Sequence, residues 1–361
     1  MPGKQFSILI LVIAVWMAGC AVNINQPVLP AAATALVAAG PDLQTTQVPV
    51  TWSGLKLGGR LIYLAGTQQD GNPLVTLESL DLANGVITPI FRTPPQEWIY
   101  AACVSPDNKQ IVLSYATAAN FPAIYNMPSN GASMQLLFRP PTRDDQYTQP
   151  VWSPDGKFIY FVHVNFMFQT GKQNLPVYEI ERVAYPGGAP ERLLTNAYWP
   201  RLSPDGSRLA YVSQDPNNGT NRLFLANADG SNPQQVKLSG PDVPSIIDAP
   251  LFLPGGRTVL FSAPAPALSF TPGWLDWLLG VQVASAHNVI SEWWSVPAAG
   301  GIPTQLTHIQ APGLYASISP DGQWLASFSA NGIFVMHPDG SGLIEIVSAV
   351  GGVAGTVDWI P

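Results

Sequence analysis

The sequence predicts an all-β fold built from repeated antiparallel units, and three observations point to this class. Charged residues make up only 11% of the chain, against about 25% in an ordinary globular domain, while Gly and Pro number 32 and 36. A Ser-Pro-Asp-Gly motif recurs at nearly constant spacing, and a second series of Gly-containing turns follows it. Short strands joined by tight turns explain all three observations, because long amphipathic helices need a charged outer face.

The first motif places a tight turn between two apolar strands. Its prolines are Pro106, Pro154, Pro204, Pro254 and Pro320, which are 48, 50, 50 and 66 residues apart. Pro presets φ for a turn and Gly tolerates φ above zero. A large apolar residue stands two positions before each proline: Val104, Trp152, Leu202, Phe252 and Ile318. Another stands five positions after it, so each unit is predicted to contain a β-hairpin.

A second hairpin follows in every unit. Its turns are Asn84-Gly85, Asn130-Gly131, Gly187-Gly188, Asp229-Gly230, Gly300-Gly301 and Asp339-Gly340. Asn-Gly and Asp-Gly between apolar runs are strong hairpin signals. Each unit therefore holds four antiparallel strands, A to D, which is the composition of a propeller blade. Six such units predict a six-bladed β-propeller.

The two ends of the repeat region predict how the ring closes. Residues 59–64 match strand B of blade 3, residues 156–161, but no Ser-Pro-Asp-Gly strand precedes them. At the end of the chain, Trp359 and Pro361 repeat the spacing of Trp152 and Pro154. We therefore expect residues 357–361 to be strand A of blade 1, which would leave no open sheet edge there. The alternative places Val50-Thr-Trp-Ser53 in that strand.

The N-terminal region predicts export. Lys4 precedes an apolar run from Phe6 to Met17, which is too short to cross about 30 Å of hydrocarbon comfortably and is typical of a signal peptide. We predict a lipoprotein signal peptide over residues 1–19, a flexible tether over 20–50 and the propeller over 51–361, with an insertion at 263–290. The alternative for the N-terminus is an uncleaved membrane anchor.

Two resemblances extend this interpretation. The Ser-Pro-Asp-Gly repeat over residues 55–361 resembles that of the TolB family, and the same repeat occurs in the N-terminal propellers of prolyl oligopeptidase relatives. Ala18-Gly19-Cys20 resembles the bacterial lipobox, although Met17 replaces the usual Leu. The resemblances imply an extracytoplasmic protein-binding propeller, tethered to the membrane of the bacterial cell envelope through a lipid on Cys20. The Asp residues of the repeat are expected to be structural.

The sequence contains no recognisable catalytic or metal-binding motif. It has no Gly-x-Ser-x-Gly elbow, no Gly-rich phosphate loop and no metal-ligand spacing, and its four histidines stand singly on different blades. We therefore expect no enzymatic activity, no cofactor and no metal. Cys103 has no cysteine partner in the exported domain and is expected to be a small buried apolar residue. Arg201 and Asp358 share one repeat position in opposed blades, so both side chains could approach the central channel.

One rim of the propeller is predicted to bind a partner, because the D–A and B–C loops share it. The expected contact residues are Trp98, Tyr100, Tyr147, Tyr198, Trp199 and Tyr315. The insertion in blade 5 adds a short helix that is apolar nearly all round and contains Trp274, Trp277 and Leu278. That helix would serve as extra core, as a partner-binding element or as a membrane-dipping segment.

The leading functional hypothesis is a monomeric interaction scaffold that binds an envelope protein or a cell-wall component. Nucleic acid is not expected as a partner, because residues 258–361 carry six acidic side chains and no Lys or Arg. The alternative is an extracytoplasmic hydrolase or lyase that acts on peptide or polysaccharide at the channel mouth. A third hypothesis is a passive sensor or accessory subunit.

Overall fold

The computed structural model describes residues 36–37, 43–69, 72–165, 168–169, 172–173, 176–215, 220–241, 243–244, 246–264, 290–348 and 356–361. All of them belong to one compact unit, residues 33–361. The predicted signal peptide and Cys20 lie outside the described residues, as do Trp274, Trp277 and Leu278 of the predicted helix.

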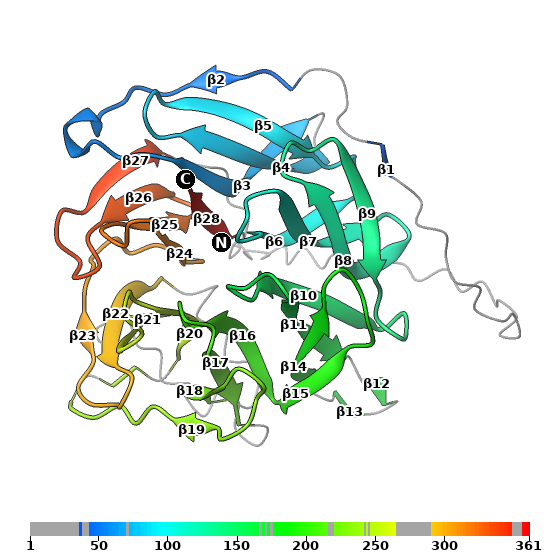
Figure 1. The fold of residues 1–361 in the computed structure, drawn as a ribbon, viewed down its shortest axis with the longest axis vertical. Helices are drawn as coiled ribbons and strands as arrows, with labels where there is room; N and C mark the ends of the chain where they lie inside the picture. The colour runs from blue at the N-terminus through cyan, green and yellow to red at the C-terminus, as the bar shows by residue number, and fades with distance from the viewer. Residues whose placement is uncertain are drawn as a thin grey trace, which may run out of the picture. The chain divides into compact units, whose positions relative to one another are not determined.

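Six antiparallel sheets form a ring, which confirms the predicted six-bladed propeller (Figure 1). The first three blades contain these strands, from the centre outward. Blade 1 has β28 (Val357–Ile360), β3 (Arg60–Gln69), β4 (Asn72–Asp81) and β5 (Val86–Arg92). Blade 2 has β6 (Trp98–Val104), β7 (Gln110–Thr117), β8 (Asn120–Pro128) and β9 (Ser133–Phe138). Blade 3 has β10 (Asp145–Trp152), β11 (Phe158–Asn165), β14 (Val177–Ala184) and β15 (Glu191–Thr195), with a separate hairpin of β12 (Phe168–Gln169) and β13 (Lys172–Gln173).

The other three blades repeat the same order. Blade 4 has β16 (Ala197–Leu202), β17 (Arg208–Gln214), β18 (Asn221–Asn227) and β19 (Gln234–Gln235). Blade 5 has β20 (Asp248–Phe252), β21 (Thr258–Ala263), β22 (Glu292–Pro297) and β23 (Thr304–Gln305). Blade 6 has β24 (Tyr315–Ile318), β25 (Leu325–Ser329), β26 (Gly332–Met336) and β27 (Ile344–Ser348).

The ring closes through the last strand of the chain, as the repeat spacing predicted. β28 pairs antiparallel with β3, and Trp359 stands opposite Leu61. The Trp359 indole N–H donates to the Gly58 carbonyl at 2.9 Å. The alternative strand around Trp52 is wrong, because Trp52 precedes a 3-10 helix, η1 (Ser53–Leu55). Its buried indole instead donates to the Leu82 carbonyl at 2.7 Å.

Two short strands lie within residues 20–50, the range assigned to a tether. β2 (Thr46–Gln47) pairs with the outer strand β5, and β1 (Leu36–Val37) pairs with β9. Both add a fifth strand to the outer edge of a blade. An outer strand offers unpaired backbone groups, and a passing segment that hydrogen-bonds to them covers part of that edge. This part of the range is therefore paired with the propeller.

The Ser-Pro-Asp-Gly turns are held by one repeated set of hydrogen bonds. In blade 3, Ser153 Oγ donates to Asp155 Oδ1 at 2.7 Å, and Ser153 Oγ in turn accepts from the Phe158 N–H at 2.9 Å. The Lys157 N–H donates to the same Asp155 oxygen at 3.1 Å. Gly156 has φ of 70°, which a side chain would oppose. The aspartates of the repeat therefore cap turns, as expected.

The hydrophobic core lies within and between the blades. Trp293 of β22 is fully buried, and its indole N–H donates to Ser327 Oγ of β25 at 2.7 Å, which links blade 5 to blade 6. In the same way, the Trp152 indole N–H of blade 3 donates to the Cys103 carbonyl of blade 2 at 3.2 Å. Large aromatic residues fill the wedge between neighbouring sheets, and their polar atoms find partners there.

Candidate functional site: the centre of the ring

Six side chains hold the same place in the six innermost strands, three residues before the motif proline or its equivalent. We call these residues the axial ring: Cys103, Val151, Arg201, Leu251, Ser317 and Asp358. All but Val151 are partly exposed, although most of their chain neighbours are buried. The innermost strands, which contain the axial ring, surround the centre of the propeller (Figure 1).

The axial ring carries one basic and one acidic side chain, on opposed blades. Asp358 in blade 1 accepts a hydrogen bond from the Val104 N–H at 2.7 Å. Burial raises the pKa of Asp358, and this effect outweighs the Val104 hydrogen bond and the positive charge of Arg201, which both lower it. In the part of the chain that the structure describes, the Arg201 guanidinium makes no ion pair within 4.0 Å. Its positive charge acts to lower the pKa values of Asp358, Cys103 and Tyr315, so Arg201 lies near all three groups.

Cys103 is a poor nucleophile in this setting. Burial, followed by the charge of Asp358, raises the pKa of its thiol to about 12. A thiolate is the reactive form of cysteine, so such a thiol is inert near neutral pH. The expected small apolar role agrees with this pKa, although Cys103 is partly exposed rather than fully buried.

Three adjacent blades carry a strained bulge near the axial ring. Gln149, Trp199 and Ala249 stand five residues before the motif proline and have φ of 51°, 58° and 46°. Each lies where the register of the innermost strand shifts. Left-handed backbone at a residue other than Gly costs about 1–3 kcal/mol, and such strain gathers at functional sites. The Trp199 N–H donates to Gln149 Oε1 at 2.8 Å, which joins two of the bulges.

Most of the predicted rim aromatics are buried rather than exposed. Tyr147, Tyr198, Trp199 and Tyr315 are each at most 8% exposed. Trp199 packs against Tyr315 with ring centroids 5.5 Å apart, and Tyr147 packs against Phe161 at 4.6 Å. These four side chains therefore pack against neighbouring strands, and a partner contact through them stays a prediction.

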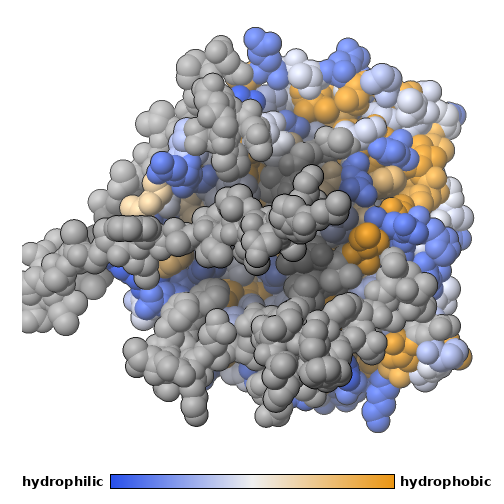
Figure 2. All heavy atoms as spheres, turned by 180° about the vertical axis from the view of Figure 1, so that it is seen from behind, coloured by the Kyte–Doolittle hydropathy of each residue, from blue (hydrophilic) through white to orange (hydrophobic). Residues whose placement is uncertain are grey.

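Two aromatic residues of the predicted rim remain accessible. Tyr100 is 43% exposed and Trp98 is half-buried. Figure 2 shows the face opposite to that of Figure 1, where the described hydrophobic residues form small patches between hydrophilic ones. Exposed aromatic contact area on the described part of this rim is therefore limited.

One cluster of ionisable side chains is not predicted by the sequence motifs. His163 does not stand singly: its Nδ1 lies 2.9 Å from Glu181 Oε1 and 3.8 Å from Glu179 Oε2, and its Nε2 lies 3.5 Å from Asp145 Oδ2. Burial lowers the pKa of His163, but the hydrogen bond and charge of Glu181, together with Asp145, raise it overall. The alternation Glu-x-Glu on a strand is the one signal that could have indicated this cluster, because it puts both carboxylates on one face.

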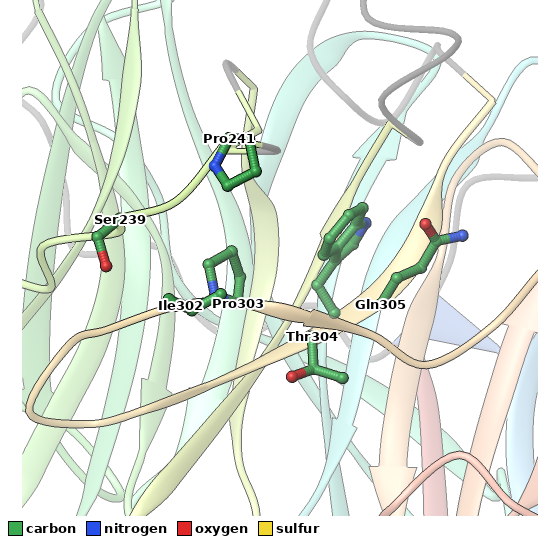
Figure 3. Close-up of a pocket in the computed structure, with 7 residues that line it drawn as sticks. Ser239, Pro241, Ile302, Pro303, Thr304 and Gln305 are labelled. Atoms are coloured by element: carbon green, nitrogen blue, oxygen red, sulfur yellow. The ribbon is translucent and has the colours of Figure 1, made fainter.

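A separate hollow lies on the outer part of blades 4 and 5 (Figure 3). It has a volume of about 320 Å³ and is lined by Ser239, Pro241, Trp294, Ile302, Pro303, Thr304 and Gln305. Ile302 is 68% exposed, but none of the lining side chains is titratable. This hollow suits a small apolar contact and offers no group for acid–base chemistry.

Comparison with known proteins identifies the fold. Neither a protein-family model nor a curated protein sequence matches the chain. Among solved structures, TolB from Acinetobacter baumannii is similar with a TM-score of 0.57 and 18% identity, over 84% of this chain and 67% of that one. The structure of a putative TolB from Agrobacterium tumefaciens gives a TM-score of 0.52 and 17% identity, over 84% and 99%. The chain is a TolB-like propeller in its fold.

Other propellers are similar as well. An oligogalacturonate lyase in complex with manganese aligns with a TM-score of 0.50 and 13% identity, over 81% of this chain and 86% of that one. At such low identities the TolB-like fold is shared but the activity does not follow from it. No helix among the described residues is both long and apolar enough to traverse a bilayer.

Proposed function

We propose that this TolB-like propeller is an extracytoplasmic interaction scaffold, held at the cell envelope by a lipid on Cys20. Its partner, an envelope protein or a cell-wall component, binds where the D–A and B–C loops meet the centre of the ring. The observation that carries this proposal is the axial ring, in which Arg201 and Asp358 are partly exposed on opposed blades. Opposite charges at a fixed separation orient a partner that carries both signs, as a peptide segment does.

The strained bulges support a binding site at the same place. Gln149, Trp199 and Ala249 distort three consecutive innermost strands, and the propeller must stabilise this distortion with other contacts. A bulge re-aims side chains at the end of a strand. The ring therefore has a different shape at blades 3 to 5, beside Arg201, than at the other three blades.

The polar groups of the axial ring favour binding over catalysis. Burial makes Cys103 a weak nucleophile, and Ser317 Oγ accepts a hydrogen bond from the Trp359 N–H at 2.9 Å. The axial ring contains no histidine to act as a general base. An arginine and a carboxyl group without a base or an activated nucleophile are suited to recognition.

Site-specific photo-crosslinking tests the proposal. A photoreactive residue at Tyr100 or Gln310 would probe the D–A rim, and one at Lys157 would probe the opposite rim of Ser-Pro-Asp-Gly turns. We expect one discrete adduct from the D–A rim in intact cells, and we expect Arg201→Gln to weaken it. Arg60→Gln, a change of an exposed arginine outside the ring, is the matched control. An adduct found at Lys157 alone would show that the partner binds the rim of Ser-Pro-Asp-Gly turns, which would contradict the proposal.

A second candidate function is a lyase or hydrolase that acts on peptide or polysaccharide at the channel mouth. The observation that favours it is the position of Asp358 and Arg201 in the innermost strands of opposed blades, since a positioned carboxyl group can take part in general acid–base catalysis. Incubation with oligogalacturonate tests it through the ultraviolet absorbance of unsaturated uronate ends. Release of such ends by the wild-type chain, and its loss in Asp358→Asn, would favour the enzyme over the scaffold.

A further inference from the structure

Four ionisable side chains meet on one face of blade 3. Asp145 begins β10, His163 lies near the end of β11, and Glu179 and Glu181 lie in β14. His163 stands directly opposite Glu179, while Glu181 is one pleat further along the same face. The three strands therefore bring the four groups together at the end of the blade where strand B finishes and strand C begins.

The cluster has more acidic groups than nearby cations can balance. The side chains of Asp145, Glu179 and Glu181 are 2%, 14% and 10% exposed, and that of His163 is 10% exposed. Among the described residues, the one guanidinium bonded to them is that of Arg192, which donates to Glu179 Oε1 at 2.9 Å from a side chain that is 63% exposed. Buried carboxylates are costly unless they are paired, hydrogen-bonded or bound to a metal.

Glu292 shows how this propeller satisfies a structural carboxylate. It is 1% exposed, and it accepts hydrogen bonds from Thr307 Oγ1 and from the Ile309 and Gln310 N–H groups at 2.8 to 2.9 Å. Asp145 is equally buried, yet its Oδ1 has no hydrogen-bond partner, and neither has His163 Nε2. Asp145 Oδ1 thus lacks the donor that a structural carboxylate such as Glu292 has.

The positions of the two imidazole nitrogens suggest the missing partner. Nε2 faces the buried Asp145 carboxylate, while Nδ1 faces Glu181 and Glu179. A histidine that binds a metal through one ring nitrogen usually presents the other to a carboxylate, which fixes the ring orientation. Ligand atoms from His163, Glu179 and Glu181 all lie within 4.8 Å of one another. Metal–ligand bonds of about 2.0–2.2 Å then require only small movements of the side chains.

We propose that His163 Nδ1, Glu179 and Glu181 bind one divalent transition-metal ion and that Asp145 orients His163 through Nε2. One imidazole with two carboxylates suits Mn²⁺, Zn²⁺ or Fe²⁺. Three protein ligands leave at least one position for water or for a group of the partner. The ion would fasten β11 to β14 at the rim assigned to binding. The proposed metal site rests on the donor set alone and is independent of the proposed scaffold function.

Binding of Mn²⁺ to the full-length protein tests the proposal. Protein treated with a chelator is titrated with Mn²⁺, and free Mn²⁺ is followed by electron paramagnetic resonance. We expect one ion per chain, with electron spin echo modulation from a single coordinated imidazole nitrogen. A stoichiometry below one ion in ten chains at millimolar Mn²⁺, or bound Mn²⁺ without nitrogen coupling, would overturn the assignment. This measurement needs no variant, so misfolding cannot obscure it.

Three conservative variants test two of the ligands, Glu181 and His163, and the orienting residue Asp145. Glu181→Gln and His163→Gln should abolish the nitrogen-coupled ion, while Asp145→Asn should weaken Mn²⁺ binding by about 10- to 100-fold. Glu191→Gln, an exposed carboxylate paired with Arg182 in the same blade, is the control and should bind like wild type. Circular dichroism confirms that each variant is folded. Unchanged binding in folded Glu181→Gln would contradict the site.

Discussion

The carboxylate of Asp358 accepts a hydrogen bond from the backbone N–H of Val104 at 2.7 Å, 254 residues earlier in the chain. Thr356 Oγ1 likewise accepts from the Ala102 N–H at 2.9 Å. These contacts run from β28 of blade 1 and the residue just before it to β6 of blade 2, while the backbone of β28 pairs with β3. The last residues therefore complete one blade by backbone pairing and fasten it to the next by side chains.

Removing residues 357–361 is expected to destabilise the propeller strongly. The deletion exposes the edge of β3 and removes Trp359, which is 6% exposed. Loss of one buried aromatic side chain costs about 3–5 kcal/mol, which corresponds to a drop in Tm of at least about 5 °C. Differential scanning calorimetry checks this. Deleting the exposed Pro361 alone is the control, and a five-residue deletion that melts within about 2 °C of wild type would contradict ring closure by β28.

Asp358 tests the side-chain link between the blades. In Asp358→Ala the Val104 N–H loses its acceptor, and an unsatisfied group in a buried place costs about 1–3 kcal/mol. Asp358→Asn keeps an acceptor oxygen and should be clearly more stable than Asp358→Ala at neutral pH. Chemical denaturation of both variants measures the difference. Equal stability of the two would show that the hydrogen bond does not matter for closure.

The turn aspartates predict a loss of stability in acid. A hydrogen bond from Ser153, then one from the Lys157 N–H, lowers the pKa of Asp155 to about 2, and the corresponding bonds from Ser203 and Ser207 lower that of Asp205 to about 2. Because these pKa values are below the ordinary 3.8, the stabilisation is complete above pH 3.8 and is lost as the pH falls toward 2. Titration by carbon-13 NMR and melting curves over this range check it. Asp155→Asn should flatten the acid loss, whereas Asp144→Asn should not.

Cys20→Ser tests the lipid anchor. Without the thiol the chain cannot be acylated, so we expect the variant to leave the membrane fraction or to accumulate with its signal peptide intact. Cys103→Ser removes the other cysteine and should remain membrane-bound, which makes it the matched control. Fractionation, mass spectrometry of the N-terminus and labelling with a fatty-acid analogue measure both. A normally cleaved, membrane-bound Cys20→Ser chain would refute the lipoprotein assignment.

Replacing residues 273–286 by a short Gly-Ser turn tests the blade 5 insertion. The change lies between β21 and β22 and leaves every described strand of the propeller intact. We expect a folded protein with an unchanged far-ultraviolet spectrum and loss of the photo-crosslinked adduct from Tyr100. Unfolding would show that the segment is part of the core. An adduct that survives in the folded variant would show that the partner does not need the insertion.

The sequence by itself determined the blade count, the turns and the closing strand. These features depend on local chemistry: Pro and Gly set the turn geometry, and Trp359 with Pro361 repeats the spacing of Trp152 and Pro154. It also predicted that Arg201 and Asp358 occupy equivalent positions in their innermost strands, because the same motif recurs in each blade. The spacing of a sequence repeat therefore predicts much of the topology of the fold.

The tertiary structure decided which side chains are accessible and which meet. The sequence alone does not distinguish whether Tyr198, Trp199 and Tyr315 are exposed rim residues or buried core residues. Their packing between the blades shows that they are buried. His163 meets Glu179 and Glu181 because β11 and β14 pair in one register, and a shift of one residue would turn those groups to opposite faces. Asp145 joins them from a third strand. Contacts between strands depend on register and packing, and the period of a repeat does not specify them.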